Sequence, residues 1–321
     1  MSIPSCGTTT FLNLLTFLTS NTEYFWRFSQ PIMGKRKQLK DGDVDMDEAG
    51  RAGDESSDED TEIVNVEFEW FDPQPAVDFH GLKVLLRQLF DSDAQLFDLS
   101  ALTDLILSQP LLGSTVKVDG NETDPYAFLT VLNLHQHRDV PVIKSIIEYI
   151  KSKSSSDLFT LNELLSQPSV PQIGLILTER LINIPTEVIP PMYTMLLEEI
   201  QWALEASEPY QFTHYLIISK TYEEVESKLD MEDDRPQKKK KKAANGKPET
   251  FYFHPEDEIL QKHALCYSTY PYTHQQAEGH SDSKRAFQEL GIRPHGSMIL
   301  IEASKFETAV NAVKDYASPP S

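Results

Sequence analysis

Histidines are the side chains in this sequence best suited to chemistry. His135 and His137 lie two residues apart and are followed by Asp139, a grouping that could bind a metal ion. No third ligand follows at the spacing of a zinc motif, so a structural or solvent-facing pair is the stronger interpretation. Patterns typical of a serine-hydrolase elbow, a zinc protease or a Walker loop do not occur in the 321 residues. The sequence therefore predicts no catalytic residue, no metal ligand and no cofactor-binding residue.

Two basic clusters have the composition of nuclear import signals, and both lie in polar segments. Lysine lacks the bidentate geometry and the interleaved aromatic residues expected of specific nucleic-acid contacts, which favours addresses read by import receptors. A solvated charge run is the plainer alternative, and it is stronger for the first cluster than for five consecutive lysines. The predicted import residues are Lys35, Arg36, Lys37, Lys238, Lys239, Lys240, Lys241 and Lys242.

An acidic segment runs from Asp41 to Glu62, with eleven acidic residues and one basic residue. It contributes −10 to a formal net charge of −21. Such an excess disfavours nucleic acid as a direct ligand and favours a basic protein partner, although acidity also keeps a protein soluble. The residues predicted to capture a basic client are Asp54, Glu55, Asp58, Glu59 and Asp60.

Two serines inside the acidic segment are candidates for phosphorylation. Ser56 and Ser57 each have an acidic residue three positions on, Glu59 and Asp60 respectively. That spacing suits an acidophilic kinase, and phosphate groups would deepen the negative charge of the segment.

The cysteine count and the hydropathy of the chain indicate the cellular compartment in which the protein works. Cys6 and Cys266 are the only cysteines, too few for a disulfide framework or a cysteine-based zinc site, which indicates a reducing, intracellular compartment. No apolar run reaches the roughly 18 residues that a membrane-spanning helix needs.

Strand-like and helix-like stretches alternate from Ile63 onward. Residues 63–71 alternate apolar and polar positions, the period of a strand, and Asp78 is expected to cap a helix that ends at Phe90. We expect further strands at 116–118, 127–134, 173–182, 212–219, 251–253, 264–269 and 298–301, and further helices at 99–107, 142–149, 158–165, 192–205 and 304–316, the last capped by Ser304. This mixture predicts one mixed α/β (α+β) domain over residues 63–317.

The rest of the chain divides into three segments by composition. Residues 1–32 are predicted to be a non-functional extension, because Met33-Gly34-Lys35 has the look of a natural start. Residues 33–62 are predicted to be a disordered basic and acidic tail. Residues 223–248 are predicted to be a charged insertion loop, since an acidic half precedes the five lysines.

One long motif resembles a known family. The sequence from Asn65 to Pro73, followed by Asp78 to Lys83 and Leu85 to Phe90, resembles the BCCIP family of eukaryotic nuclear proteins, in particular its fungal Bcp members. The resemblance extends over residues 63–317. It implies a fold similar to the GCN5-related acetyltransferases without their catalytic activity. It also implies a dedicated chaperone of a large-subunit ribosomal protein and a part in nuclear export of a phosphoinositide kinase.

The acetyltransferase-like fold can be checked against the sequence. Enzymes of that kind hold the pyrophosphate of their cofactor with backbone N–H groups of a glycine-rich turn that opens a helix. Gln172-Ile173-Gly174 places one glycine inside an apolar strand, and Gln288 to Gly291 is followed by Ile-Arg-Pro. Neither segment has the Gln-x-x-Gly-x-Gly pattern, so we expect no cofactor.

The charge pattern and the absence of catalytic motifs predict a non-enzymatic protein that binds a basic client, and the resemblance implies a nuclear chaperone or escort that acts in 60S ribosome biogenesis and shuttles to the cytoplasm. The partners that the resemblance implies are a basic large-subunit ribosomal protein and a phosphoinositide kinase. We also expect import and export receptors as partners, with no direct nucleic acid and no membrane. The alternative is a divergent acyltransferase that binds acyl-CoA through an unrecognised loop.

Overall fold

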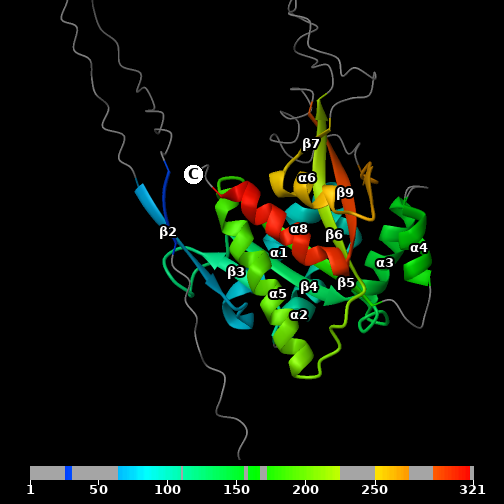
Figure 1. The fold of residues 1–321 in the computed structure, drawn as a ribbon, viewed down its shortest axis with the longest axis horizontal. Helices are drawn as coiled ribbons and strands as arrows, with labels where there is room; N and C mark the ends of the chain where they lie inside the picture. Colours follow the sequence, from blue (N-terminus) through cyan, green and yellow to red (C-terminus); the bar gives the residue numbers. More distant parts are fainter. Residues whose placement is uncertain are drawn as a thin grey trace, which may run out of the picture.

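A computed structural model, shown in Figure 1, gives the arrangement of the folded part of the chain. The structure describes residues 26–30 as backbone and, further on, residues 64–109, 111–154, 158–166, 172–224, 250–274 and 292–318. Lys35 to Lys37, the acidic segment 41–62, the five lysines and both candidate phosphorylation sites lie outside the described residues.

The described strands form one mixed sheet in the order β1-β2-β3-β4-β5-β6-β9-β8, with β7 paired to β6 off this path. The strands are β1 (Trp26–Gln30), β2 (Val64–Phe71), β3 (Ser114–Lys117), β4 (Ala127–Asn133), β5 (Ile173–Arg180), β6 (His214–Glu224), β7 (Thr250–Tyr252), β8 (Cys266–Tyr270) and β9 (Ile292–Glu302). The predicted mixed α/β fold is confirmed for the described residues, and the structure shows that it is built on a single sheet.

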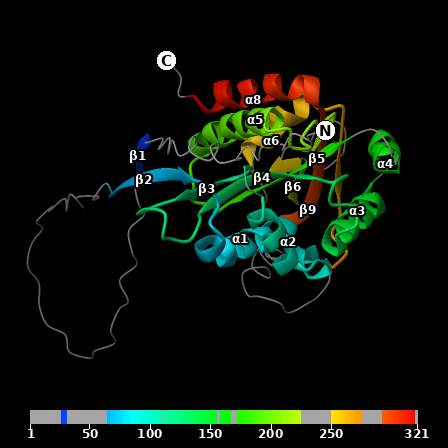
Figure 2. The ribbon, with the colours of Figure 1, turned by 90° about the horizontal axis from the view of Figure 1, so that it is seen from below.

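Helices cover both faces of this sheet. They are α1 (Pro75–Phe90), α2 (Leu99–Leu107), α3 (Pro141–Lys153), α4 (Phe159–Ser166), α5 (Ile189–Glu205), α6 (Pro255–Lys262) and α8 (Ala303–Ala317), with short 3₁₀ turns at Asp91–Leu96 and Thr186–Val188. Figure 2 shows α5, α6 and α8 on one side of the sheet and α1 and α2 on the other, with α3 and α4 towards one end. Among the described residues, no helix combines the length and apolar character needed to cross a bilayer.

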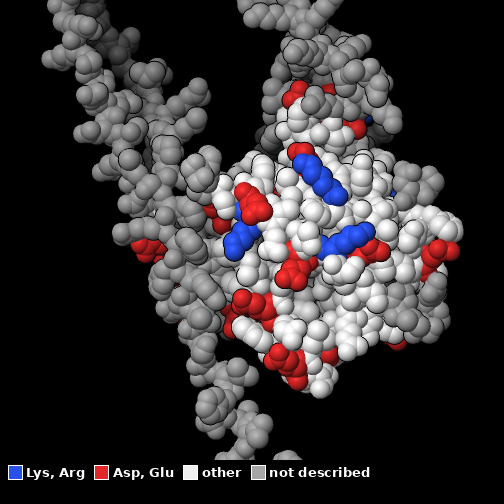
Figure 3. All heavy atoms as spheres, viewed as in Figure 1, with Lys and Arg blue, Asp and Glu red and all other residues white. Residues whose placement is uncertain are grey.

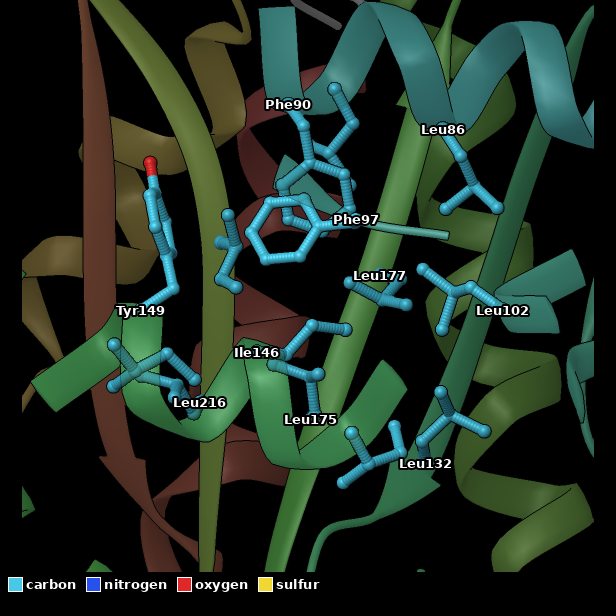
Figure 4. Packing of buried hydrophobic residues seen from close by; sticks show 14 of the residues in the cluster. Leu86, Phe90, Phe97, Leu102, Leu132, Ile146, Tyr149, Leu175, Leu177 and Leu216 are labelled. Carbon is cyan, nitrogen blue, oxygen red and sulfur yellow. The ribbon is translucent and has the colours of Figure 1, made fainter. Parts of the chain in front are cut away.

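Two hydrophobic cores result from the period-2 alternation of the central strands. On β5, Leu175 and Leu177 face the core under α1, α2 and α3, whereas Ile176 faces the core under α5 and α8. Figure 4 shows the first core, where Leu175 and Leu177 meet Leu86 of α1 and Ile146 of α3. Because β5 is buried on both faces, it reads as a continuous apolar run, as expected of a central strand.

The hairpin between β3 and β4 is fastened to the start of α1 by a buried ion pair. Asp119 and Gly120, in the connection between the two strands, adopt positive φ angles of 63° and 90°. Lys117 Nζ lies 2.6 Å from Asp78 Oδ1, and both side chains are fully buried. The same ammonium donates to the carbonyl oxygen and Oδ1 of Asn121, at 2.7 and 2.8 Å, so all three of its protons have acceptors.

Two predicted helix caps are corrected by the structure. Helix α1 begins at Pro75, so Asp78 lies in its first turn and accepts a hydrogen bond from the Gln74 N–H at 2.7 Å, instead of standing at the N-cap. Helix α8 begins at Ala303 after Glu302, whose side chain makes no capping bond, so Ser304 lies inside the helix. In α1, proline at the first position and the carboxylate of Asp78 in the first turn favour the start of the helix.

Several predicted boundaries also differ. Strands β6 and β9 run farther than expected because each pairs with the other over eleven positions, and Glu223 and Glu224 therefore belong to β6 and not to the insertion loop. Helix α3 continues to Lys153, beyond its predicted end at residue 149. Helix α6 was not predicted. Finally, β1 pairs antiparallel with β2, so the segment predicted to lie outside the fold contributes a strand.

Candidate functional site

Strands β5 and β6 are the one parallel pair of neighbours among the described strands. In open α/β sheets, a ligand ordinarily binds in the crevice outside the carboxyl ends of neighbouring parallel strands. Pairing of β5 with β6 stops after Ile176 and Ile217, although both strands continue. The opening beyond those residues is thus the place where a ligand site is most expected.

The chain itself occupies this opening. Strand β9 pairs with the whole length of β6 on one edge, so the other edge is shared between β5 at residues 214–217 and β7 at residues 221–223. From β7 the chain passes through His254 into α6, whose first residues Glu256 and Asp257 are buried. The start of α6 therefore brings three buried titratable side chains to the carboxyl end of β5.

Glu179 of β5 is the centre of the cluster on the α1 side. Its Oε2 lies 2.5 Å from Lys220 Nζ, and its Oε1 lies 3.0 Å from His254 Nε2. Gln88 of α1 donates to Glu179 Oε1 at 3.1 Å, while the Gln88 carbonyl oxygen accepts from Lys220 Nζ at 3.1 Å. Glu179 is thus contacted from α1, from β6 and from the residue before α6.

Arg180 extends the cluster to the α6 side of the sheet, because its side chain and that of Glu179, as neighbours on one strand, point to opposite faces. Both of its terminal nitrogens donate to the carboxylate of Glu256, with a distance of 3.0 Å from Nη2 to Oε2. The next residue, Asp257, accepts a hydrogen bond from the Ser219 hydroxyl of β6. Bidentate pairing of this kind fixes α6 against the sheet in orientation as well as position.

The pKa values follow from these contacts. Burial opposes ionisation of Glu179, but the hydrogen bonds and charges of His254 and Lys220 outweigh it and lower its pKa to about 2. Burial likewise opposes protonation of His254, whereas contact with Glu179 raises its pKa. Burial raises the pKa of Asp257 to about 7, and neighbouring Glu256 adds to the rise against the opposing effect of His254. Glu179 and His254 thus favour one another's charged forms.

The arrangement indicates a structural cluster. Each of its carboxylates contacts a cation or a hydroxyl of the cluster, and none of its charged side chains is more than slightly exposed. The Ser219 hydroxyl donates to Asp257, whereas the Nε2 of His254 faces Glu179, so the serine and the histidine of the cluster do not form the hydrogen-bonded pair of a Ser-His-acid triad. The cluster was missed at the sequence level because its residues are dispersed, and the signal available was a run of charged residues at the end of an apolar strand, Glu179-Arg180.

A second buried acid fastens the segment that follows β8. Asp93 accepts hydrogen bonds from the N–H groups of Thr273, at 2.8 Å, and His274, at 3.2 Å, and from the Tyr149 hydroxyl at 3.0 Å. Lys153 Nζ lies 3.5 Å from the same carboxylate. These contacts join α3 and the turn after Phe90 to residues 271–274.

Among the described residues, one further buried acid makes no ion pair. Glu199 of α5 accepts hydrogen bonds from the Gly113 N–H at 2.8 Å and from the Ser114 hydroxyl at 3.2 Å. Gly113 adopts a φ of 119°, a conformation that suits glycine. Burial raises the pKa of Glu199 to about 7, against the effect of these two donors.

The histidine pair predicted to be structural contributes to a turn. The His135 N–H donates to Asn133 Oδ1 at 3.0 Å, and the His137 N–H donates to the Asn133 carbonyl oxygen at 3.1 Å. Within the described ranges, no three His, Cys, Asp or Glu side chains gather as metal ligands do. Figure 3 shows the surface over α5 and α8, where acidic side chains form several separate patches with few basic ones between them.

The fold and its buried cluster thus define a mixed α/β protein whose single parallel crevice is filled by its own chain. A model of the BCCIP family matches residues 63–260, and the chain belongs to this family. It is similar to Protein bcp1 of Aspergillus oryzae, with 68% identity over 291 residues, which are 90% of this chain and 100% of that protein. Protein bcp1 of Schizosaccharomyces pombe is 50% identical over 291 residues, 89% of this chain and 100% of that protein.

A solved structure supports the fold. The crystal structure of BCP1 from Saccharomyces cerevisiae matches with a TM-score of 0.56 and 27% identity, covering 82% of this chain and 94% of that one. The resemblance noted in the sequence is therefore confirmed at the level of the family. Because this match is to a family member, the expected likeness to GCN5-related acetyltransferases stays a prediction.

Proposed function

We propose that this protein is a non-enzymatic chaperone that escorts a basic ribosomal protein of the large subunit through the nucleus during 60S biogenesis. The observation that supports it most is electrostatic: the chain carries −21, and nearly half of that charge lies between Asp41 and Glu62. Ribosomal proteins are rich in Lys and Arg, and an acidic partner covers such a surface until rRNA, a denser polyanion, competes for it.

The buried cluster supports a binding role over a catalytic one. The crevice at the end of β5 is filled by His254, Glu256 and Asp257, so the place where a substrate is most expected holds the protein's own side chains. The core-facing residues around it serve to hold α6 on the sheet.

The proposal includes transport of the protein into and out of the nucleus. Lys35 to Lys37 and Lys238 to Lys242 act as import addresses, and Ser56 and Ser57 allow phosphorylation to strengthen the acidic segment. The family resemblance extends the role to nuclear export of a phosphoinositide kinase, which is tested by direct binding of the purified kinase in the presence of an export receptor.

Titration calorimetry separates the proposal from an acyltransferase. The full chain is titrated with a purified basic large-subunit ribosomal protein and, separately, with acetyl-CoA. Binding of the ribosomal protein that weakens with salt, with no heat from acetyl-CoA, is the expected result. Saturable binding of acetyl-CoA without binding of the ribosomal protein would contradict the proposal and favour the enzyme.

A further inference from the structure

Three aromatic residues form a braced group where β6 meets β7. Tyr222 pairs directly opposite Phe251, and their rings are nearly parallel, with centroids 5.2 Å apart. The ring of Phe253 lies 5.1 Å from that of Tyr222. We call Tyr222, Phe251 and Phe253 the aromatic patch. Since each ring contacts another, little side-chain freedom is left for a partner to remove on binding.

The patch lies beyond the region covered by α1. Helix α1 reaches β6 at Lys220, whose ammonium donates to the Gln88 carbonyl oxygen, and the patch begins two residues farther along the strand. Phe253 is 39% exposed, and Tyr222 and Phe251 are half-buried. Figure 1 shows β6 and β7 extending past the helices at this point. Clustered aromatic surface of this kind is typical of a binding anchor, because it would otherwise be buried.

Charged residues of both signs lie beside the patch. β6 ends at Glu223 and Glu224, and Arg293 of β9 pairs with Glu223 in the register. The positive charge of Lys220 is neutralised by Glu179, 2.5 Å away. Phe253 already receives a cation from within the fold, since Lys220 Nζ lies 5.4 Å from the centroid of its ring.

We propose that the aromatic patch binds arginine side chains of an extended basic segment in the client, with Glu224 adding electrostatic attraction. This inference rests on the proposed function and deepens it by placing the contact on the folded domain. Aromatic faces attract cations, and the planar guanidinium also stacks on them. Single-stranded RNA uses similar rings for base stacking, but Glu223 and Glu224 would repel its phosphates, so a basic peptide is favoured.

Substitutions at Phe253 separate cation binding from simple burial. The full chain is titrated with a short peptide of alternating arginine and serine at about 0.15 M salt, where the long-range effect of the tail is screened. Phe253→Leu keeps apolar bulk without a π face, and should weaken binding about twofold to thirtyfold. Phe253→Trp offers the stronger face and should bind equally or more tightly. Trp202→Leu is the control, because Trp202 is 54% exposed on α5, away from the patch.

The outcomes distinguish the inference from the proposed function. Equal binding by Phe253→Leu and wild type overturns the patch, and the proposed function stands if wild type still binds the ribosomal protein. Failure of wild type to bind that protein contradicts the proposed function. If wild type binds oligouridine and Phe253→Leu does not, the patch binds RNA and the proposed binding of a basic peptide is overturned. If Phe253→Leu lowers the melting temperature, the titration is repeated with Glu224→Gln as the test variant. Unchanged binding of the peptide by Glu224→Gln overturns the electrostatic contribution.

Discussion

Glu179 Oε2 on β5 lies 2.5 Å from Lys220 Nζ on β6, three positions beyond the last residues that the two parallel strands pair. The ion pair thus replaces main-chain hydrogen bonds where the strands separate. Both side chains are buried, so the pair is screened little by solvent. Its geometry also sets where His254 and α6 can pack.

Removing the Glu179 charge should destabilise the fold strongly. Glu179→Gln leaves Lys220 as a buried cation without its counter-ion and removes the carboxylate that raises the pKa of His254. Loss of one member of a buried pair costs about 3 kcal/mol or more of the free energy of unfolding. Urea denaturation followed by circular dichroism measures the change. Glu258→Gln is the matched control, because the Glu258–Lys262 pair is exposed and its loss should cost less than about 1 kcal/mol. Equal losses in the two variants would contradict a central role for the cluster.

The acid on α5 should make stability fall as pH rises. Burial raises the pKa of Glu199 from 4.5 to about 7, so the folded state binds its proton more tightly than the unfolded state. The stabilisation from the protonated carboxyl group is complete below about pH 4.5 and is lost as pH rises through about 7. The free energy of unfolding falls by up to about 3 kcal/mol over this range. Glu199→Gln removes this titration and should gain stability relative to wild type between pH 5 and about 8. The variant-minus-wild-type difference in melting temperature isolates Glu199 from Asp257, whose pKa burial also raises to about 7. A difference that does not change with pH would disprove the assignment.

Loss of the Asp93 carboxylate should release residues 271–274 locally. Asp93→Asn replaces one acceptor oxygen by an N–H₂ group that faces the N–H donors of Thr273 and His274, and should cost about 1–3 kcal/mol. Hydrogen exchange should speed up at Thr273 and His274 while amides of β5 stay protected. Asp104→Asn, on the exposed side of α2, is the control and should leave exchange unchanged. Uniform acceleration over the whole domain would mean a global rather than a local effect.

The sequence predicted most of the elements because their signals are local. The alternation of β2, the apolar run of β5 and the apolar stripe of α2 each identify an element without help from the rest of the chain. Helix α6 was missed because its sequence, Pro255 to Lys262, is strongly charged and its buried acids contact Arg180 and Ser219, far away in the chain. Tertiary pairing of this kind leaves no periodic trace.

The candidate functional residues likewise fall into those that a sequence pattern predicts and those that only the fold brings together. The predicted capture, import and phosphorylation residues are sequence patterns that lie outside the described residues, so they stay predictions. The buried cluster depends on the register of β5 with β6 and on the path of β7, neither of which follows from a single sequence. The aromatic patch required the pairing of Tyr222 with Phe251 across an insertion.

Nuclear import should depend on the lysine clusters. Replacing Lys238 to Lys242 by alanine changes charges between β6 and β7 and should leave the melting temperature unchanged, while a fluorescent fusion accumulates less in the nucleus. The variant that also lacks Lys35, Arg36 and Lys37 should show the larger loss. An unchanged nuclear signal in the combined variant would remove both clusters as addresses. A fusion carrying alanine in place of Lys144 and Lys151, which are exposed on α3, controls for net charge.

The acidic tail should act on the rate of association with a basic client. Replacing Asp54, Glu55, Asp58, Glu59 and Asp60 by Asn or Gln removes peripheral charges, and such charges steer the encounter more than they hold the complex. The association rate constant should therefore fall at low salt, whereas the dissociation rate constant changes little. Raising the salt concentration above about 0.1 M shortens the screening length to about 10 Å, so the association rate constants of wild type and variant should become similar. Stopped-flow mixing with a basic ribosomal protein at two salt concentrations makes the measurement. Equal association rates at low salt would show that the tail serves solubility alone, and attraction would then have to come from the folded domain, where Phe253→Leu should have the larger effect.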